Sequence, residues 1–298
     1  MGISVSQTVL LLIPMTSAAS VCLHFGYTLQ KKAAQKLTGV QFGFKSLGAY
    51  VKTKNWVLGI LTTLVGTALI IIALRIGPIS TIQPLLGGGL IFLVLFSRFY
   101  LREQVGGSDY AALGLVIVGV VLLGLTTSDA HIASVSYEPR RLFGFAAVIM
   151  VAVCGAQVLL RLIFGQSKMD IRYGIFSGVF FAFASLFMRA MFNGMRLYPL
   201  ATFYWFIPLA VASGVMGFSL IQRGFNHGRA VIVIIFCDIA NQLTVIAGGL
   251  FCFKEKLPTE PLLFALKVFA LGLLVVGSVM LSRFGRASPQ AVATGDRH

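Results

Sequence analysis

Residues 228–255, GRAVIVIIFCDIANQLTVIAGGLFCFKE, decide the fold of this chain. They hold one long apolar run, and an α-helix needs about 20 such residues to cross a hydrocarbon core ~30 Å thick. Similar runs recur through all 298 residues, of which 57% are hydrophobic and 11% charged. Lipid offers the backbone no hydrogen-bonding partner, and the alternating pattern of barrel strands is missing, so each run is predicted to be helical. We therefore expect an all-α polytopic membrane protein.

The apolar runs predict nine transmembrane helices, at residues 7–29, 55–76, 79–98, 109–127, 142–163, 172–192, 200–222, 230–252 and 262–283. Residues 31–54 fall outside this set because they hold six lysines among aromatic side chains. Such a segment is expected to lie in the headgroup layer. The alternative is a short span at 38–51, which would make ten. Residues 285–298 are predicted to be a disordered tail.

The formal net charge of +15 is carried by lysines and arginines that flank the apolar runs. Such residues mark the cytoplasmic side of a membrane protein, so we expect them to set topology and infer no nucleic-acid partner. With the N-terminus outside, sixteen basic residues fall inside and six outside, which favours N-out and C-in. A ten-span chain would start inside, with thirteen against nine. The expected membrane is a bacterial inner membrane.

Enzymatic activity finds no support in the sequence. Nine helices with short connections use nearly the whole chain, which leaves no room for a soluble catalytic domain. GxSxG, HExxH and Walker motifs are absent, and no His, Cys and carboxylate side chains cluster at ligand spacing. We therefore predict no catalytic residues and no cofactor. Four isolated cysteines in apolar runs are expected to be packing residues: Cys22, Cys154, Cys237 and Cys252.

An internal repeat relates the two halves of the chain. Residues 77–103, GPISTIQPLLGGGLIFLVLFSRFYLRE, and the opening stretch both end in a glutamate and start 151 positions apart. Five spans separate the third helix from the eighth, so the copies insert with opposite orientation. We predict an N-terminal repeat at 1–127 and an inverted C-terminal repeat at 140–284. Inverted repeats favour transport by alternating access around a central site, whereas a duplication could also build only a stable bundle.

The polar residues of the eighth span indicate where that site lies. Asp238, Asn241 and Gln242 share one helical face, which cannot point at lipid. An aspartate inside a span costs ~2.5–3.5 kcal/mol, so it should face a cavity, a proton or cation, or an arginine. Asp238 aligns with Gly87 of the other repeat, near Gln83, where proline and glycines loosen the helix. Those glycines could equally serve close helix packing.

Further polar residues within spans could line the same cavity: His24, Tyr27, Gln157, Ser185 and Arg189. Arg189 could pair with Asp238 or with an anionic substrate group, or extend to the membrane surface. His24 could be a packing histidine. Glu103 and Glu255 lie at helix ends beside basic residues and could be interfacial ion pairs, helix stops or gates.

Several stretches resemble the drug/metabolite transporter superfamily, and most nearly its EamA-like and NIPA-like, magnesium-transporter-related branch. They are GYTLQKKAAQKL after residue 25, ALRIGPISTIQPLLGGGLIFLVLFSRFYLRE before residue 104, and FSLIQRGFNHGRAVIVIIFCDIANQLTVIAGGLFCFKE before residue 256. The resemblance covers about residues 7–283. It implies nine or ten helices in two inverted repeats that move a small solute by alternating access.

Magnesium transport would normally call for more carboxylates at membrane depth than Asp238 alone. We therefore predict a secondary transporter of a small anionic or zwitterionic organic solute, in which Asp238 couples a proton or cation and would be the metal ligand if there is one. Asn241, Gln242, Gln83 and Tyr27 are the expected hydrogen-bonding contacts. The alternatives are divalent-cation transport, flipping of a lipid-linked headgroup, and a non-transporting membrane subunit. Besides lipid and substrate, a homodimer or another membrane protein is a possible partner.

Overall fold

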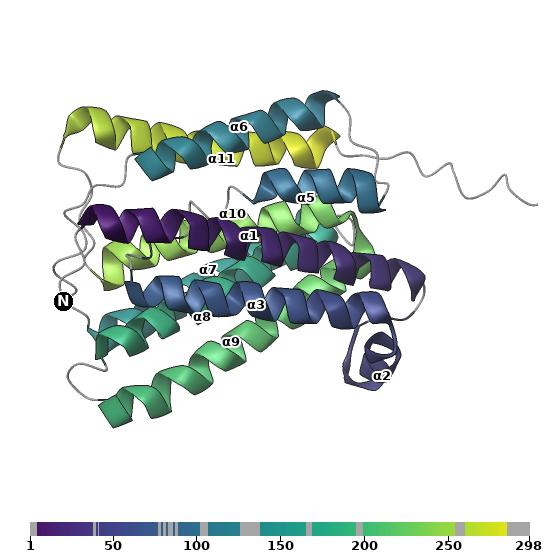
Figure 1. Ribbon diagram of the computed structural model, residues 1–298, viewed down its shortest axis with the longest axis horizontal. Coiled ribbons are helices and arrows are strands. Elements are labelled where there is room, and N and C mark those ends of the chain that lie inside the picture. The colour runs from purple at the N-terminus through teal and green to yellow at the C-terminus, as the bar shows by residue number, and fades with distance from the viewer. Residues whose placement is uncertain are drawn as a thin grey trace, which may run out of the picture.

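The long helices of this protein lie along one common axis, as helices that cross the same bilayer do (Figure 1). The computed structural model describes residues 5–37, 40, 42–76, 79, 82, 86, 89–101, 107–125, 138–164, 169–194, 199–253 and 260–284. All regular elements within these ranges are helices. The predicted all-α polytopic fold is therefore confirmed.

Up to residue 125 the structure contains α1 (Val5–Lys36), α2 (Leu47–Val51), α3 (Lys54–Ile76), α5 (Leu90–Phe96) and α6 (Gly107–Leu125). A 3-10 turn at Phe44–Ser46 precedes α2, and a π-helical turn at Ser97–Leu101 extends α5. The rest of the chain forms α7 (Pro139–Phe164), α8 (Met169–Gly194), α9 (Pro199–His227), α10 (Ala230–Cys252) and α11 (Pro261–Phe284).

Most predicted spans coincide with a helix. The bounds of α10 are those predicted, whereas α1 continues seven residues beyond its predicted end at residue 29. Within the described residues, five helices are long and apolar enough to cross a membrane, namely α3, α7, α8, α9 and α10. Shorter apolar helical stretches lie at Tyr110–Gly119 and Pro261–Gly277. The predicted span 79–98 is described only in part, so the total of nine remains a prediction.

The lysine-rich segment after α1 forms a compact turn. Its only α-helix in the described residues, α2, has five residues, or about 8 Å of length, which is far short of a bilayer. The ring of Phe42 packs 5.2 Å from that of Tyr50, and Tyr50 lies 6.1 Å from Trp56 at the start of α3. These contacts fold the segment against the end of the bundle, and its place in the headgroup layer remains a prediction.

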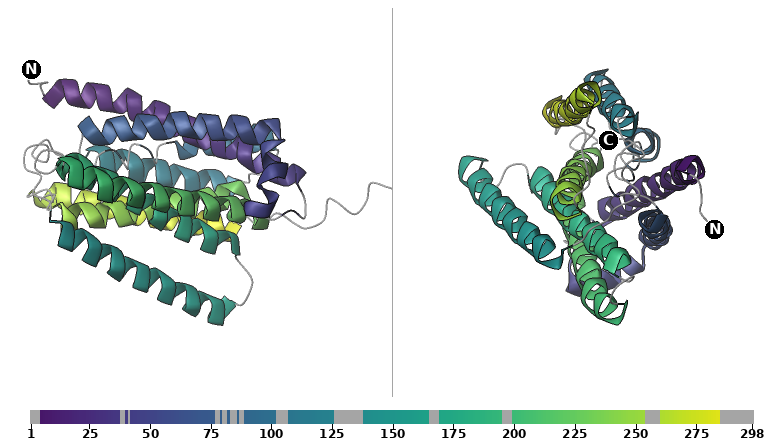
Figure 2. Two further views of the ribbon diagram at one scale, coloured as in Figure 1. Left: turned by 90° about the horizontal axis from the view of Figure 1, so that it is seen from below. Right: turned by 90° about the vertical axis from the view of Figure 1, so that its left-hand side faces the viewer.

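Helix pairs build the bundle. α1 packs along α3, α8 packs against both α9 and α10, and α6 packs along α11 (Figures 1 and 2). α7 lies at the outside of the bundle (Figure 2), and its Val151 and Leu162 are 74% and 77% exposed. Exposed apolar side chains along a helix of this length fit contact with lipid.

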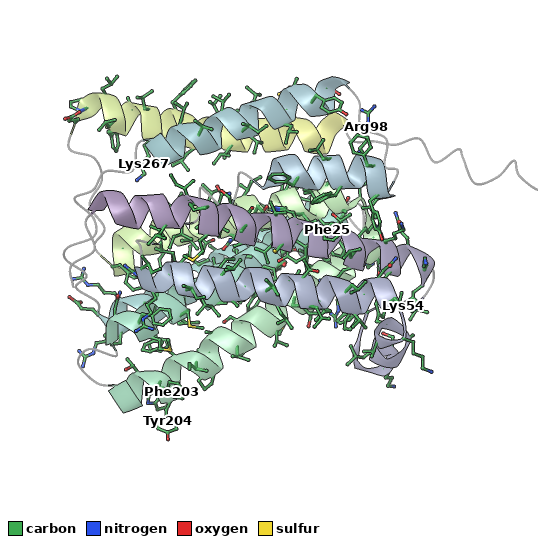
Figure 3. All side chains as sticks on the ribbon, viewed as in Figure 1. Phe25, Lys54, Arg98, Phe203, Tyr204 and Lys267 are labelled. Carbon is green, nitrogen blue, oxygen red and sulfur yellow. The ribbon has the colours of Figure 1, made fainter. Side chains whose placement is uncertain are left out.

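Aromatic side chains mark one end of the bundle. Phe203 and Tyr204, near the start of α9, project away from the neighbouring helices (Figure 3). Amphipathic rings in such positions are typical of the membrane–water interface. The cores of the bundle are otherwise made of buried aliphatic and aromatic residues contributed by both halves of the chain.

Candidate functional site

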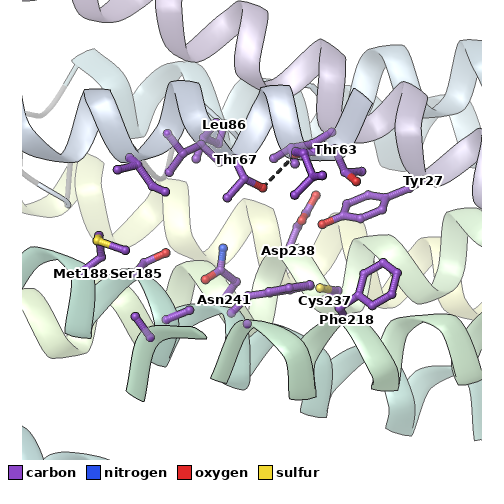
Figure 4. Close-up of a pocket in the computed structure, with 18 of the residues that line it drawn as sticks. Tyr27, Thr63, Thr67, Leu86, Ser185, Met188, Phe218, Cys237, Asp238 and Asn241 are labelled. Atoms are coloured by element: carbon purple, nitrogen blue, oxygen red, sulfur yellow. Dashed lines mark hydrogen bonds between the residues drawn. The ribbon is translucent and has the colours of Figure 1, made fainter. Parts of the chain in front are cut away.

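A cavity of about 470 Å³ lies between α1, α3, α8, α9 and α10 (Figure 4). Most of its lining is aliphatic or aromatic. The polar residues of the lining are His24, Tyr27, Thr63, Thr67, Ser185, Asp238, Asn241 and Gln242. Lysine and arginine are missing among the described residues that line it. The cavity therefore offers a substrate several oxygen atoms and one carboxylate, and no fixed cation from these residues.

Asp238 is paired with His24 across the two halves of the chain. Nε2 of His24 lies 3.0 Å from Oδ2 of Asp238. His24 is only 3% exposed, whereas the Asp238 side chain, at 18%, reaches the cavity. The other ring nitrogen of His24, Nδ1, lies 2.7 Å from the carbonyl oxygen of Ser20 one turn earlier. His24 is thus held on α1 with its ring directed at the carboxylate on α10.

These contacts limit where a proton can lie in the pair. A carbonyl oxygen only accepts, so Nδ1 of His24 donates to Ser20. Nε2 then either donates to an ionised Asp238, which makes His24 an imidazolium, or accepts a proton from a neutral carboxyl group. A proton lies between Nε2 and Oδ2 in both cases, and the pair carries no net charge.

The three polar residues predicted to share a face of the eighth span do meet in the cavity. Asp238, Asn241 and Gln242 all line it, and Asn241 points into it (Figure 4). Tyr27 lines it from α1, on the side of Asp238. Helical periodicity was sufficient to group the residues of α10, because i, i+3 and i+4 positions lie on one side of any α-helix.

Two threonines of α3 were missed by the sequence analysis. Thr67 Oγ1 donates to the carbonyl of Thr63 (2.8 Å), as the dashed line in Figure 4 shows, and Thr63 Oγ1 lies 3.0 Å from the carbonyl of Gly59. These bonds use the hydroxyl hydrogens and leave oxygen lone pairs for a substrate. Their spacing of four residues within an apolar run was the available signal.

A buried amide cluster, also missed, links three helices beside the cavity. Gln222 of α9 donates to the side-chain oxygen of Gln30 on α1, and Gln30 Nε2 donates to Thr63 Oγ1 at 3.3 Å. Gln30 and Gln222 are 0% and 1% exposed. Buried amides that bond each other fix the relative positions of helices, because each partner would be costly to leave alone.

Two predicted cavity residues lie elsewhere. Gln157 of α7 accepts a bond from Arg172 Nε (2.6 Å) and is absent from the cavity lining. Arg189 donates to the backbone carbonyl of Leu74 on α3 (2.6 Å) and is also absent from the lining. Of the alternatives for Arg189, neither pairing with Asp238 nor extension to the membrane surface is found, since Asp238 is paired with His24 and Arg189 is only 7% exposed.

The remaining candidates, Gln83, Gly87, Glu103 and Glu255, lie outside the described residues. Within the residues that the structure covers, groups of three or more His, Cys, Asp and Glu side chains that could enclose a metal ion do not occur. A metal ion in the cavity would therefore be held by Asp238 together with neutral oxygen atoms and water.

The fold is that of an all-α, multi-pass membrane protein with a partly polar cavity between its helices. The chain is 29% identical over 296 residues to a probable magnesium transporter, NIPA9 of Arabidopsis thaliana, a match that covers 94% of this chain and 85% of the relative. A likeness of this extent supports a membrane transporter. No family model matches, so placement in the drug/metabolite superfamily rests on the residues alone. Nor does any solved structure match.

The relative also bears on two further predictions. It is a plant protein, so it lends no support to the expected bacterial inner membrane. Its description as a transporter agrees weakly with the prediction that the chain is not an enzyme. Lipid and a small molecule or ion are the partners that a membrane transporter requires.

Proposed function

We propose that this protein is a secondary transporter of divalent cations, with Mg²⁺ as the first candidate, and that the cation passes through the cavity beside Asp238. The observation that carries the proposal is that a carboxylate lines the cavity without a lysine or arginine beside it in the described lining. Asp238 is the ionisable acid of the lining, and its described residues include no lysine or arginine to attract an anion. A cation that takes the place of the proton shared with His24 is the charged substrate that Asp238 can bind there.

The size and chemistry of the cavity suit a partly hydrated ion. Mg²⁺ gives up water reluctantly and is usually bound through one or two carboxylates with several waters retained. Six waters at about 30 Å³ each occupy about 180 Å³, which fits within about 470 Å³. Asn241, Gln242, Thr63 and Thr67 can accept bonds from such waters. One deep carboxylate is then sufficient, and the relative described as a magnesium transporter supports the same cargo.

Matching helix contacts in the two halves support the proposed repeat. A Cβ on Gly66 of α3 would lie 2.9 Å from the carbonyl oxygen of Ala19 on α1. A Cβ on Gly217 of α9 would lie 3.1 Å from the carbonyl oxygen of Ser177 on α8. Ser177 follows Ala19 by 158 positions and Gly217 follows Gly66 by 151, the repeat shift found in the sequence. The α1–α3 pair is thus the counterpart of the α8–α9 pair.

A second pair of helix contacts is related by the same two shifts in sequence position. Gly89, at the start of α5, packs closely against Ser20 on α1, and Gly178 on α8 packs against Ala240 on α10. Gly178 follows Ser20 by 158 positions, and Ala240 follows Gly89 by 151. Two equivalent units on either side of a central cavity are the arrangement that alternating access uses.

The test of the proposed function is cation uptake into liposomes that hold the purified protein and a Mg²⁺ indicator dye. Replacing Asp238→Asn removes the charge but keeps the shape, and we expect uptake to fall about 100-fold or more, as for the loss of a buried charge contact. Glu138→Gln is the control, since Glu138 is an exposed carboxylate paired with Arg141. Uptake that survives Asp238→Asn unchanged would exclude this cavity as the cation path.

A small organic cation or zwitterion is the second candidate substrate. The aliphatic and aromatic lining, which includes Leu64, Ile71, Met188 and Phe218, exceeds what a hydrated ion needs. An apolar cavity with few polar groups is typical of sites for organic molecules. An anionic solute is not favoured, because Arg189, the residue expected to bind it, lies outside the cavity lining. Counterflow of labelled amino compounds in the same liposomes, without any Mg²⁺ uptake, would favour this candidate.

A further inference from the structure

Two buried basic side chains connect the halves of the protein by contacts with backbone carbonyls. Lys31 Nζ, on α1, donates to the carbonyl oxygens of Phe225 (2.6 Å) and Gly228 (2.5 Å) at the junction of α9 and α10. Arg189 Nη1, on α8, donates to the carbonyl oxygen of Leu74 on α3 (2.6 Å). Lys31 and Arg189 are each only 7% exposed.

Both contacts fall on the last turn of a helix. Phe225 is two residues from the end of α9, and Leu74 is two residues from the end of α3. The final carbonyls of a helix lack partners within it and carry about half a negative charge. A buried ammonium or guanidinium group is stabilised there, whereas it would be costly if it lost these acceptors.

The two contacts are equivalent under the repeat. Arg189 follows Lys31 by 158 positions, the shift that relates α1 to α8. Phe225 follows Leu74 by 151 positions, the shift that relates α3 to α9. Each half therefore contributes one cation and one helix end, and each cation binds the helix end of the opposite half.

These contacts lie at opposite ends of the cavity. Lys31 and Leu74 lie on opposite sides of the Ala19–Gly66 contact in the antiparallel α1–α3 pair. Counted along the helices, about 20 residues separate them, which is about 30 Å or the thickness of a hydrocarbon core. Tyr27, one turn before Lys31, lines the cavity at one end, and Leu74 itself lines it at the other.

We propose that Lys31 and Arg189 are two latches that close the cavity toward opposite faces of the membrane. Release of Lys31 separates α1 from the α9–α10 junction and opens one end, while Arg189 still holds α8 to α3. Release of Arg189 opens the other end. The structure contains the backbone contacts of both Lys31 and Arg189, so both ends are closed. The proposal rests on the alternating-access cycle proposed above, and it is independent of which cargo is carried.

The test measures access to the cavity from each face. The four cysteines Cys22, Cys154, Cys237 and Cys252 are replaced in the full chain, and Ser185→Cys supplies one thiol in the cavity. Labelling by a membrane-impermeant thiol reagent is then compared in right-side-out and inside-out vesicles. We expect Lys31→Met to raise the labelling rate about tenfold from one face and Arg189→Met to raise it about tenfold from the other, which corresponds to about 1.4 kcal/mol in the open population.

Neighbouring cations provide matched controls. Lys32 lies 3.5 Å from the centre of the Tyr100 ring, and Arg172 bonds Gln157. Lys32→Met and Arg172→Met should leave labelling from both faces unchanged. Lys31→Arg and Arg189→Lys keep the positive charge, so their labelling rates should stay close to that of the parent protein. Increased access from the same face in both latch variants, or from neither face, would overturn the proposal.

A second substitution at Lys31 guards against a failure to fold. If Lys31→Met does not yield a monodisperse protein in detergent, Lys31→Gln replaces it. Glutamine keeps a donor with a shorter reach, so we expect a smaller rise from the same face, and no rise would also overturn the latch. Labelling requires no cargo. Face-specific labelling without Mg²⁺ uptake would therefore contradict the proposed cargo and leave the latches standing.

Discussion

His24 holds its Nε2 atom 3.0 Å from Oδ2 of Asp238, and its Nδ1 atom faces the carbonyl of Ser20. The pair therefore contains one proton between an imidazole on α1 and a carboxylate on α10. A cation that binds Asp238 competes for the same oxygen atoms. Binding of a cation to Asp238 is therefore coupled to loss of the proton that Asp238 shares with His24.

The first prediction is that Mg²⁺ releases up to one proton when it binds to the purified protein. Displacement of the proton between His24 and Asp238 by the metal ion is the cause. The measurement is the colour change of a pH indicator in a weakly buffered detergent solution during titration with MgCl₂. Asp238→Asn should abolish the release, and His227→Ala, at the exposed end of α9, should not change it. Binding without any proton release would contradict the shared proton.

Close approach of α8 to α10 leads to the second prediction. A Cβ at Gly178 would collide with the carbonyl oxygen of Cys237 and lie 2.9 Å from the backbone nitrogen of Asn241. Gly178→Ala should therefore force the helices apart, lower the free energy of unfolding by about 1–3 kcal/mol and displace Asp238. We expect a lower melting temperature in detergent together with reduced uptake.

Gly155 on α7 provides the control for this substitution, because a Cβ there meets nothing within 4 Å. Gly155→Ala should be neutral or stabilise the protein by up to about 1 kcal/mol, the usual gain in helix propensity. Equal losses in both variants would mean that the effect of Gly178→Ala is general to glycines in these helices and does not come from the α8–α10 contact.

The fold was largely predictable from the sequence, and the site only in part. Length and hydropathy located the helices, and periodicity grouped Asp238, Asn241 and Gln242. Neither property says which helices are neighbours. The sequence could therefore place Arg189 within a span but not foresee that it reaches the end of α3, while His24, taken for a possible packing residue, is the partner of Asp238.

The third prediction concerns Tyr50, which anchors the short helix α2 to the end of α9. Its hydroxyl oxygen lies 3.2 Å from the side-chain oxygen of Asn226 and 3.1 Å from the carbonyl oxygen of Val40, so the two acceptors share its single hydrogen. Tyr50→Phe removes these bonds and should cost about 0.5–1.5 kcal/mol. Tyr204→Phe is the control, since Tyr204 is 70% exposed. The measurement is thermal unfolding in detergent at neutral pH.

The pH dependence of the same residue gives a second readout. Burial raises the pKa of Tyr50. A raised pKa means that the fold favours the neutral phenol, so this stabilisation is complete below about pH 10, the value for free tyrosine. It is lost as the pH rises above that value toward the folded-state pKa. Melting temperatures should fall less steeply above about pH 10 in Tyr50→Phe than in the parent, and equal slopes would contradict the anchoring role.

Reciprocal contacts between α6 and α11 lead to the fourth prediction. A Cβ on Gly119 would lie 2.9 Å from the carbonyl oxygen of Ala270, and one on Gly277 would lie 2.7 Å from that of Ala112. Gly277 follows Gly119, and Ala270 follows Ala112, by the same 158 positions. The glycine of each helix thus packs against the equivalent alanine of the other helix, which runs antiparallel to it. A two-fold axis between inverted repeats requires this arrangement.

Because these positions are equivalent, Gly119→Leu and Gly277→Leu should lower the melting temperature in detergent by similar amounts, each for the loss of close backbone contact. The melting temperature of the double variant should fall by less than the sum of the two single effects, since the first substitution already separates the two helices at the shared interface. Gly114→Leu on α6 and Gly272→Leu on α11 are matched controls, because a Cβ at either position meets nothing within 4 Å. A loss confined to one of the two glycines would show that the α6–α11 contact is not symmetric, and the axis that relates the two latches would lose its support.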